Sequence, residues 1–295
     1  KEVATVTRIL VTGATSLIGH YLLPRLAQGD DRVITAVSRQ TQPSTGNVRW
    51  ISSDISAAKD SALLDEQDAL LHLAPLWTLP AWLERSTAPG IRRVIAFSST
   101  SRFTKTASRS SYERGVAEAL ASAEGTVAEW AVCHGVDWTI FRPTLVYGGG
   151  RDKNIAAIAR FIQRFYFFPV VGAATGLRMP VHADDLAAAC LLALKNPRTF
   201  GHAYDLTGGE TLSYRAMVER VFNGLEMKPR VLAVPSGILR AAIQVATLLP
   251  GARDWTPEMA ERMALDLVFD CAPARKDFDY APRPFRPTRR DLAKG

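Results

Sequence analysis

A glycine-containing turn near the start of the chain has the residue types that bind phosphate groups. An apolar run over residues 9–11 leads into Gly13, residues 14–16 are small, and Gly19 follows within an apolar helical pattern. Glycine permits a sharp turn, small neighbours let a pyrophosphate approach the backbone, and the amides at a helix N-terminus attract its charge. Ser16 stands where a third glycine would complete the pattern, so an ordinary strand–turn–helix without a ligand is the alternative.

The end of the second predicted strand bears on which nucleotide would bind. Ser38 and Arg39 stand where an NAD-binding unit places an acidic residue on the ribose hydroxyls. A hydroxyl and a guanidinium suit a 2′-phosphate instead, so we expect NADP, with NAD as the alternative cofactor and an exposed loop arginine as the alternative role of Arg39. After the third strand, Asp54 and its apolar neighbour Ile55 are placed to flank an adenine ring, although Asp54 could equally cap a helix.

Hydroxyl side chains also follow a later strand. The apolar residues 94–97 lead into Ser98, Ser99, Thr100 and Ser101. Open α/β sheets bind their ligands beyond the carboxyl ends of their strands. This run is therefore a second candidate for the ligand site.

These residues need a parallel sheet to bring them together. Apolar runs at residues 32–39, 48–51, 69–74, 94–97 and 138–144 alternate with helical patterns, which is the βαβ rhythm of a doubly wound sheet. Beyond residue 147 the rhythm changes. The sequence thus predicts an α/β, Rossmann-type doubly wound parallel sheet in residues 1–147 and a smaller C-terminal substrate lobe in residues 148–295, from which about residues 177–207 return to the Rossmann core.

The composition is that of an ordinary globular protein of 295 residues, 47% hydrophobic and 22% charged. Three widely spaced cysteines and the lack of a close His/Cys cluster argue against a disulfide framework and a metal site, and favour a cytoplasmic location. We find no signal-peptide pattern and no segment suited to span a membrane. The net charge of +7 lies partly in a basic stretch at residues 275–294. No aromatic-interleaved basic motif accompanies it, so we expect no nucleic-acid partner.

Several motifs in order resemble those of the extended short-chain dehydrogenase/reductase superfamily, and within it the NAD(P)-dependent epimerase/dehydratase group. The similarity rests on residues 12–19, 71–74, 97–100, 142–148, 180–187 and 266–270, and so covers nearly the whole chain. It implies a Rossmann fold, an NAD(P) cofactor and hydride transfer between the nicotinamide and a substrate carbon.

The resemblance also implies a catalytic pair. In this family a Tyr-x-x-x-Lys helix supplies the general acid/base, and a Ser or Thr after the fifth strand binds the substrate oxygen. These roles fall to Tyr112 and Thr100, but Val116 stands where the motif has its lysine. Without that ammonium, little tyrosinate is expected at neutral pH, which favours reduction over epimerisation. The alternative is that Lys105, on the preceding loop, takes the place of the motif lysine.

The remaining site residues follow from the same resemblance and the motifs above. The predicted cofactor contacts are Gly13, Thr15, Ser16, Leu17, Ile18, Gly19, Ser38, Arg39, Asp54, Ile55, Leu73, Ala74, Pro75, Ser98, Ser99, Tyr112, Pro143 and Val146. The predicted substrate contacts are Thr100, Tyr147 and His182.

We therefore expect an NADP(H)-binding oxidoreductase or epimerase-like protein that acts on a carbonyl or nucleotide-sugar substrate. The alternative is a non-catalytic NADP(H)-binding sensor or a structural subunit of a larger assembly. RNA binding is a weaker third alternative that rests on the net charge and the basic stretch, and a homodimer is an open alternative for the quaternary structure.

Overall fold

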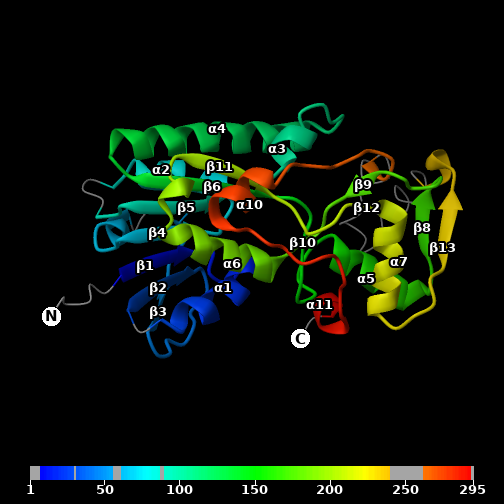
Figure 1. Cartoon of the computed structure of the whole chain (residues 1–295), viewed down its shortest axis with the longest axis horizontal. Coiled ribbons are helices and arrows are strands. Elements are labelled where there is room, and N and C mark those ends of the chain that lie inside the picture. The colour runs from blue at the N-terminus through cyan, green and yellow to red at the C-terminus, as the bar shows by residue number, and fades with distance from the viewer. Residues whose placement is uncertain (1–6, 30, 56–60, 87–89, 240–261, 294–295) are drawn as a thin grey trace.

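A seven-stranded parallel sheet forms the larger part of the molecule, which we describe from a computed structural model of residues 7–29, 31–55, 61–86, 90–239 and 262–293 (Figure 1). Its strand order is β11-β6-β5-β4-β1-β2-β3, and each pairing within it is parallel. The strands are β1 (Thr7–Thr12), β2 (Arg32–Ser38), β3 (Val48–Ser52), β4 (Ala69–His72), β5 (Arg93–Phe97), β6 (Asp137–Pro143) and β11 (His202–Leu206). This confirms the predicted doubly wound Rossmann arrangement.

Both faces of the sheet are covered, which explains why its strands are apolar throughout. In β1, Ile9 and Val11 belong to the apolar core on one face, and Leu10 belongs to the core on the other. Helices α1 (Leu17–Ala27), α6 (Ala183–Leu194) and α10 (Ala272–Phe278) contribute to the first core. Helices α2 (Pro80–Leu83) and α4 (Ser111–Cys133) contribute to the second, and the short α3 (Ser101–Thr104) packs on α4.

A smaller lobe lies at the other end of the molecule (Figure 1). It has an apolar core of its own, which includes Ile162, Phe168 and Phe222. In this lobe β8 pairs with β13 in parallel, and β9 pairs with β12 in antiparallel orientation. Its elements are α5 (Ile155–Phe165), β8 (Phe168–Val171), β9 (Leu177–Arg178), β12 (Leu212–Ser213), α7 (Tyr214–Gly224) and β13 (Val231–Val234).

The chain crosses between the two parts several times. At the junction, β7 (Val146–Tyr147) pairs in parallel with β10 (Val181–His182). The chain then returns to the large sheet, where α6 packs on α1 and β11 pairs with β6. Residues 271–280 also return to the core of the large sheet, although the predicted boundary places them in the smaller lobe.

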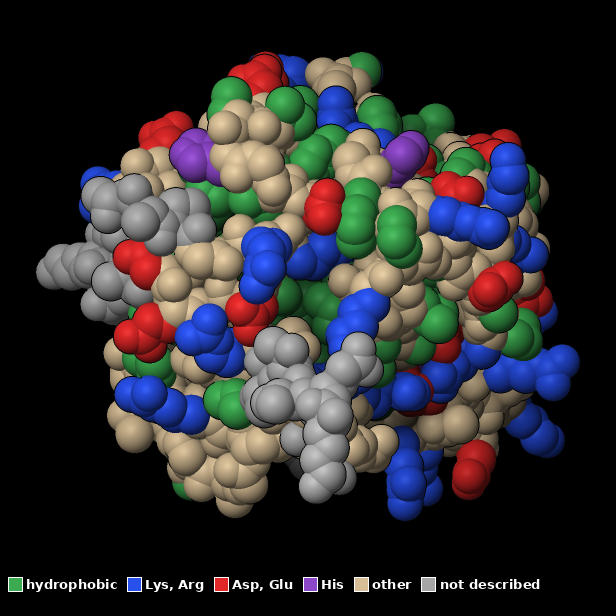
Figure 2. All heavy atoms as spheres, turned by 60° about the vertical axis from the view of Figure 1, so that its left-hand side comes forward, with side chains coloured by type: hydrophobic (Ala, Val, Ile, Leu, Met, Phe, Trp, Pro, Cys, Tyr) green, Lys and Arg blue, Asp and Glu red, His purple; other side chains and the backbone are tan. Residues whose placement is uncertain are grey.

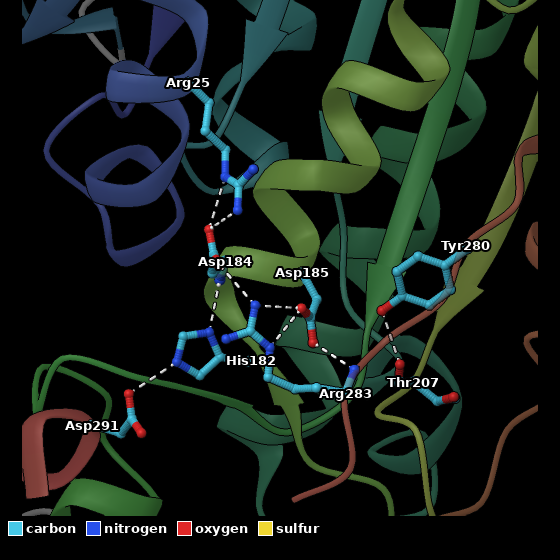
Figure 3. A network of polar contacts seen from close by, with 8 residues as sticks. All are labelled: Arg25, His182, Asp184, Asp185, Thr207, Tyr280, Arg283 and Asp291. Carbon is cyan, nitrogen blue, oxygen red and sulfur yellow. Dashed lines mark hydrogen bonds and ion pairs between the residues drawn. The ribbon is translucent and has the colours of Figure 1, made fainter. Parts of the chain in front are cut away.

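Polar contacts fasten the C-terminal segment to this junction (Figure 3). The Arg283 guanidinium lies 2.7 Å from a carboxylate oxygen of Asp184 and 2.8 Å from one of Asp185, both in the first turn of α6. Asp184 also accepts a hydrogen bond from Arg25 of α1 at 2.8 Å. These contacts connect α1, α6 and the C-terminal segment, three elements that are far apart in the sequence.

The described residues do not meet the requirements for a membrane-spanning helix, a disulfide or a metal site. Among the described helices, none combines the length and the apolar composition that crossing a bilayer requires. The cysteines form no disulfide: Cys133 is exposed, whereas Cys190 and Cys271 are buried. Within the described ranges, the side chains of His, Cys, Asp and Glu form no group that could hold a metal ion.

Candidate functional site

The turn between β1 and α1 needs its two glycines. Gly13 has a φ of +64°, and a Cβ atom on it would lie 2.5 Å from the backbone nitrogen of Ala74. A Cβ atom on Gly19 would lie 2.1 Å from the carbonyl oxygen of Ala14. The Ser16 hydroxyl caps α1 by accepting a hydrogen bond from the Gly19 amide at 3.2 Å. The N-terminus of α1 is thereby held close to the backbone that follows β4.

A first cavity, of about 360 Å³, lies against this turn. It is formed where β1, β2, β3 and β4 end, which is the carboxyl edge of the sheet. Ser38 and Arg39 line it from the end of β2, and Asp54 and Ile55 line it from the residues after β3. The structure therefore places a cation and a hydroxyl in the same cavity as the glycine turn.

A second cavity, of about 510 Å³, lies where the large sheet meets the smaller lobe. Its wall comes from the first turn of α1, the residues after β5 and the residues before α5. Residues 262–269 supply further side chains, Arg262 among them. Because Ser16 and Leu73 line both cavities, the two cavities meet at the N-terminus of α1.

Most of the predicted site residues line one of these cavities. In the first are Gly13, Thr15, Ser38, Arg39, Asp54, Ile55, Ala74 and Pro75, in the second are Leu17, Ile18, Ser99, Thr100 and Val146, and in both are Ser16 and Leu73. The predicted residues that line neither cavity are Gly19, Ser98, Tyr112, Pro143, Tyr147 and His182. Two of these residues make hydrogen bonds next to the cavities. Ser98 donates a hydrogen bond to Glu124, and the carbonyl of Pro143 accepts one from the Thr100 hydroxyl at 3.2 Å.

Tyr112 does not reach the second cavity. It lies in the first turn of α4, and 78% of its surface is exposed. Val116, four residues further along the helix, packs against the apolar core beneath α4. Of the predicted catalytic pair, Thr100 therefore lines the second cavity, and Tyr112 is not among the residues of its wall.

Tyr147 and His182 are buried at the junction of the two parts. Figure 3 shows His182 between Asp184 and Asp291. The Nδ1 atom of His182 accepts a hydrogen bond from the Asp184 amide at 3.1 Å and so caps α6. The Nε2 atom lies 3.0 Å from the Asp291 carboxylate. Burial raises the pKa of Tyr147, whose ring packs edge-on against His182. These contacts support the junction, and neither residue lines the first or the second cavity.

A charged cluster at the second cavity was not found from the sequence. The Glu113 carboxylate accepts hydrogen bonds from Arg262 at 2.7 and 2.8 Å and from the Ser108 hydroxyl at 2.7 Å, and it lies 3.3 Å from Lys105 Nζ. Burial acts to raise the pKa of Glu113, but the hydrogen bonds from Ser108 and Arg262 and the charges of Arg262 and Lys105 lower it below its ordinary value. Glu113 is therefore a carboxylate that holds two cations, both of which line the cavity.

Asp152, an acidic residue in the wall of this cavity, already has hydrogen-bond partners. Its carboxylate accepts hydrogen bonds from the amides of Asn154 and Ala156 at 2.9 and 3.1 Å, at the start of α5. Burial raises its pKa, although these backbone hydrogen bonds act in the opposite direction. The neighbouring Lys153 is exposed and lines the same cavity. Asp152 therefore positions the start of α5. Lys105, Lys153 and Arg262 give the wall of the cavity its positive charge.

One face of the molecule shows the distribution of charged side chains on the surface. Figure 2 shows basic side chains spread over one face of the molecule and interspersed with acidic ones. The described residues of that face do not form the continuous basic stripe that nucleic-acid-binding proteins use.

Comparison with known proteins assigns the chain to a family. The model of the "NAD dependent epimerase/dehydratase family" matches residues 9–88 and 81–207, which is more than half of the chain. The chain belongs to this family. The glycine turn and most of the residues that line the two cavities lie within the matched range. Arg262, Leu267 and Phe269, which line the second cavity, follow it in the sequence.

Individual relatives are more distant. An uncharacterised protein of Sinorhizobium fredii is 30% identical over 149 residues, which are 50% of this chain and 37% of that protein. A mitochondrial protein of Arabidopsis thaliana, named as NADH dehydrogenase [ubiquinone] 1 alpha subcomplex subunit 9, is 27% identical over 166 residues, 52% of this chain and 41% of that one. The match thus spans less than half the length of these two relatives.

Among solved structures, the UDP-glucuronic acid 4-epimerase of Bacillus cereus, in complex with UDP-glucuronic acid and NAD, is similar over nearly its whole length. It superposes with a TM-score of 0.70 at 17% identity, and the match covers 94% of this chain and 95% of that one. At this identity the likeness confirms the epimerase fold. This chain has two features that dinucleotide binding uses in that fold. Gly13 has no side chain, so the turn after β1 packs closely on the backbone at Ala74, and the N-terminus of α1 lies where the two cavities meet.

Proposed function

We propose that this family member is an NADP(H)-dependent reductase of a carbonyl compound. The observation that carries the proposal is the meeting of the two cavities at the N-terminus of α1. In this proposal the first cavity holds the adenosine half of the dinucleotide, the helix terminus holds the pyrophosphate, and the second cavity holds the reactive half with the substrate. The bound dinucleotide supplies a hydride.

The preference for NADP rests on Arg39. The structure brings Arg39 and Ser38 to the wall of the first cavity at the end of β2. A guanidinium pairs with a phosphate through charge-assisted hydrogen bonds, which are stronger than those it makes to ribose hydroxyls. NAD is the alternative, since the Bacillus cereus relative is in complex with NAD.

Reduction is preferred to epimerisation because of the groups at the second cavity. Among the described residues in its wall there is no tyrosine and no histidine. An epimerase has to take up the proton of an alcohol and later return it, and so needs a base at neutral pH. A reductase needs only a proton donor for the oxygen that receives the hydride's electron pair, and Lys105 at this cavity can provide one.

The proposal is tested by mixing the protein and NADPH with a panel of aldehydes and ketones, some of them carrying a carboxylate or phosphate. We expect loss of the absorbance of the reduced nicotinamide with at least one member of the panel and slower loss with NADH. UDP-glucose and UDP-glucuronic acid are assayed in parallel for inversion of their sugars. Inversion without net oxidation of NADPH would replace the reductase function by an epimerase function.

A non-catalytic NADP(H)-binding subunit is the second candidate. It is favoured by the exposed position of Tyr112 and by the similarity to the Arabidopsis thaliana NADH dehydrogenase subunit. In that case NADPH binds with micromolar affinity and is oxidised by none of the carbonyl compounds. Fluorescence titration with NADPH beside the turnover assay therefore separates the two functions.

A further inference from the structure

Lys105 lies at the second cavity in a position that the sequence motifs do not mark. It follows the last residue of α3, five positions after Thr100, and both residues line this cavity. Its side chain is 25% exposed, so it lies largely within the wall. The short α3 thus brings a hydroxyl and an ammonium to the same cavity from the end of β5.

Two other donors at this cavity, Thr100 and Arg262, are less suited to give up a proton, and Lys153, which also lines it, is exposed. The Thr100 hydroxyl already donates to the Pro143 carbonyl at 3.2 Å. The Arg262 guanidinium holds both oxygens of Glu113, and arginine does not lose its proton in proteins. Lys105 is held by Glu113 at the longer distance of 3.3 Å, and an ammonium has three N–H groups, of which one such contact uses one.

We propose that Lys105 is the proton donor of the reduction, in the role that the sequence motif gives to Tyr112. This inference rests on the proposed reductase function. The hydride from NADPH adds to the carbonyl carbon, the carbonyl π electrons become a lone pair on oxygen, and Lys105 Nζ transfers its proton to that oxygen. The products are the alcohol and NADP⁺, and water returns a proton to the amine of Lys105.

Glu113 is a positioning residue in this scheme. Its carboxylate is fixed by Ser108 and Arg262 and lies 3.3 Å from Lys105 Nζ. This ion pair holds the ammonium at the wall of the cavity, and an ammonium has further N–H groups that can be directed at the oxygen of the substrate.

The test compares Lys105→Ala and Lys105→Arg with the unmodified protein in single-turnover oxidation of NADPH. We expect both variants to slow the chemical step about 100-fold or more. Lys105→Arg keeps the positive charge beside Glu113 but has no proton to release. If Lys105 served only to pair with Glu113, this variant would keep the rate of the unmodified protein. Lys228→Ala, an exposed lysine remote in sequence from α3, is the matched control and should turn over normally.

Two readouts separate a proton donor from a structural residue. Ethylammonium ions added to Lys105→Ala should restore turnover in proportion to their concentration, because the small amine can fill the space left by the side chain. NADPH titrated by fluorescence should bind Lys105→Ala within about threefold of the unmodified affinity, since the charge lost is not at the phosphates.

Other outcomes overturn the inference. Full rescue by arginine, absence of rescue by the amine, or a loss in Tyr112→Phe that equals the loss in Lys105→Ala each removes Lys105 from the role. If the unmodified protein binds NADPH and reduces no carbonyl compound, the reductase function fails and the proton-donor role fails with it. Normal turnover by Lys105→Ala rejects only the role of Lys105 and leaves the reductase function in place.

Discussion

The Glu124 carboxylate accepts hydrogen bonds from Arg142 at 2.9 Å and 2.6 Å, and these bonds fix the middle of α4 on β6. Tyr112 precedes Glu124 by twelve residues, which is about 18 Å of helix. The start of α4 therefore extends beyond the carboxyl edge of the sheet, and Tyr112 is carried out into solvent.

We expect Glu124→Ala to destabilise the protein by about 2–4 kcal/mol, because it leaves Arg142 and Arg102 without the carboxylate between them. Chemical denaturation followed by circular dichroism measures this. Glu129→Ala, an exposed glutamate on the same helix, should change the free energy of unfolding by less than about 0.5 kcal/mol. Equal effects of the two substitutions would mean that Glu124 does not anchor α4.

Gly13→Ala should disrupt the cofactor turn more than another glycine with a similar backbone. Gly13 and Gly46 have φ values of +64° and +57°, so alanine strains both by about 1 kcal/mol. Only at Gly13 would the new Cβ meet backbone, at 2.5 Å from the Ala74 nitrogen, whereas nothing lies within 4 Å of Gly46. We expect Gly13→Ala to weaken NADPH binding at least about tenfold and Gly46→Ala to leave it unchanged, as isothermal titration would report.

Arg39→Asp tests the choice of cofactor. Loss of a charge-assisted contact to the 2′-phosphate, with a carboxylate in its place, should raise the NADPH dissociation constant by about 10- to 100-fold. NADH has no such phosphate, and its affinity should stay the same or improve. Arg49→Asp makes the same charge change at an exposed residue of β3 outside the cavity wall and controls for the general loss of positive charge. Parallel losses for both cofactors would remove Arg39 from the site.

His72 should make the fold sensitive to mild acid. It is fully buried beside Thr12, with Nδ1 and the threonine hydroxyl 2.8 Å apart, and burial lowers its pKa from 6.5 to about 4. Between these two values the unfolded chain binds a proton that the folded chain does not, so stability is complete above pH 6.5 and decreases as the pH falls towards 4.

The expected loss on going from pH 7.5 to pH 5 is about 2 kcal/mol in the unmodified protein. His72→Gln, which does not titrate, should lower stability at pH 7.5 but show a smaller decrease between the two pH values. Urea unfolding at each pH measures the difference. An equal decrease in both proteins would assign the acid sensitivity to other groups, such as the carboxylates.

Local patterns in the sequence were sufficient to predict the large sheet and much of the first cavity. Strand, turn and helix follow each other within a few residues there, so Gly13, Ser16 and Arg39 are brought together by short-range geometry. The second cavity depends on contacts between distant segments. Arg262 meets Glu113 across 149 residues, and no spacing in the sequence encodes that meeting.

The predicted site residues that line neither cavity share a physical feature. A motif gives the types of its residues, but the position of a helix along a sheet is set by a tertiary contact such as that of Glu124 with Arg142. Polar residues that cap or support a junction, such as His182, also have the same types as residues that bind a ligand. Only the surroundings of the side chain distinguish the two.

The fastening of Arg283 to α6 imposes an order of events during synthesis of the chain. Asp185 leaves the ribosome 98 residues before Arg283, which at the usual rate of elongation is a delay of about 5 to 20 s. During that time the first turn of α6 has two adjacent carboxylates without this partner, and the core beneath it lacks the residues of α10. The nascent chain therefore has an incomplete sheet face that a chaperone could recognise until the C-terminal segment arrives.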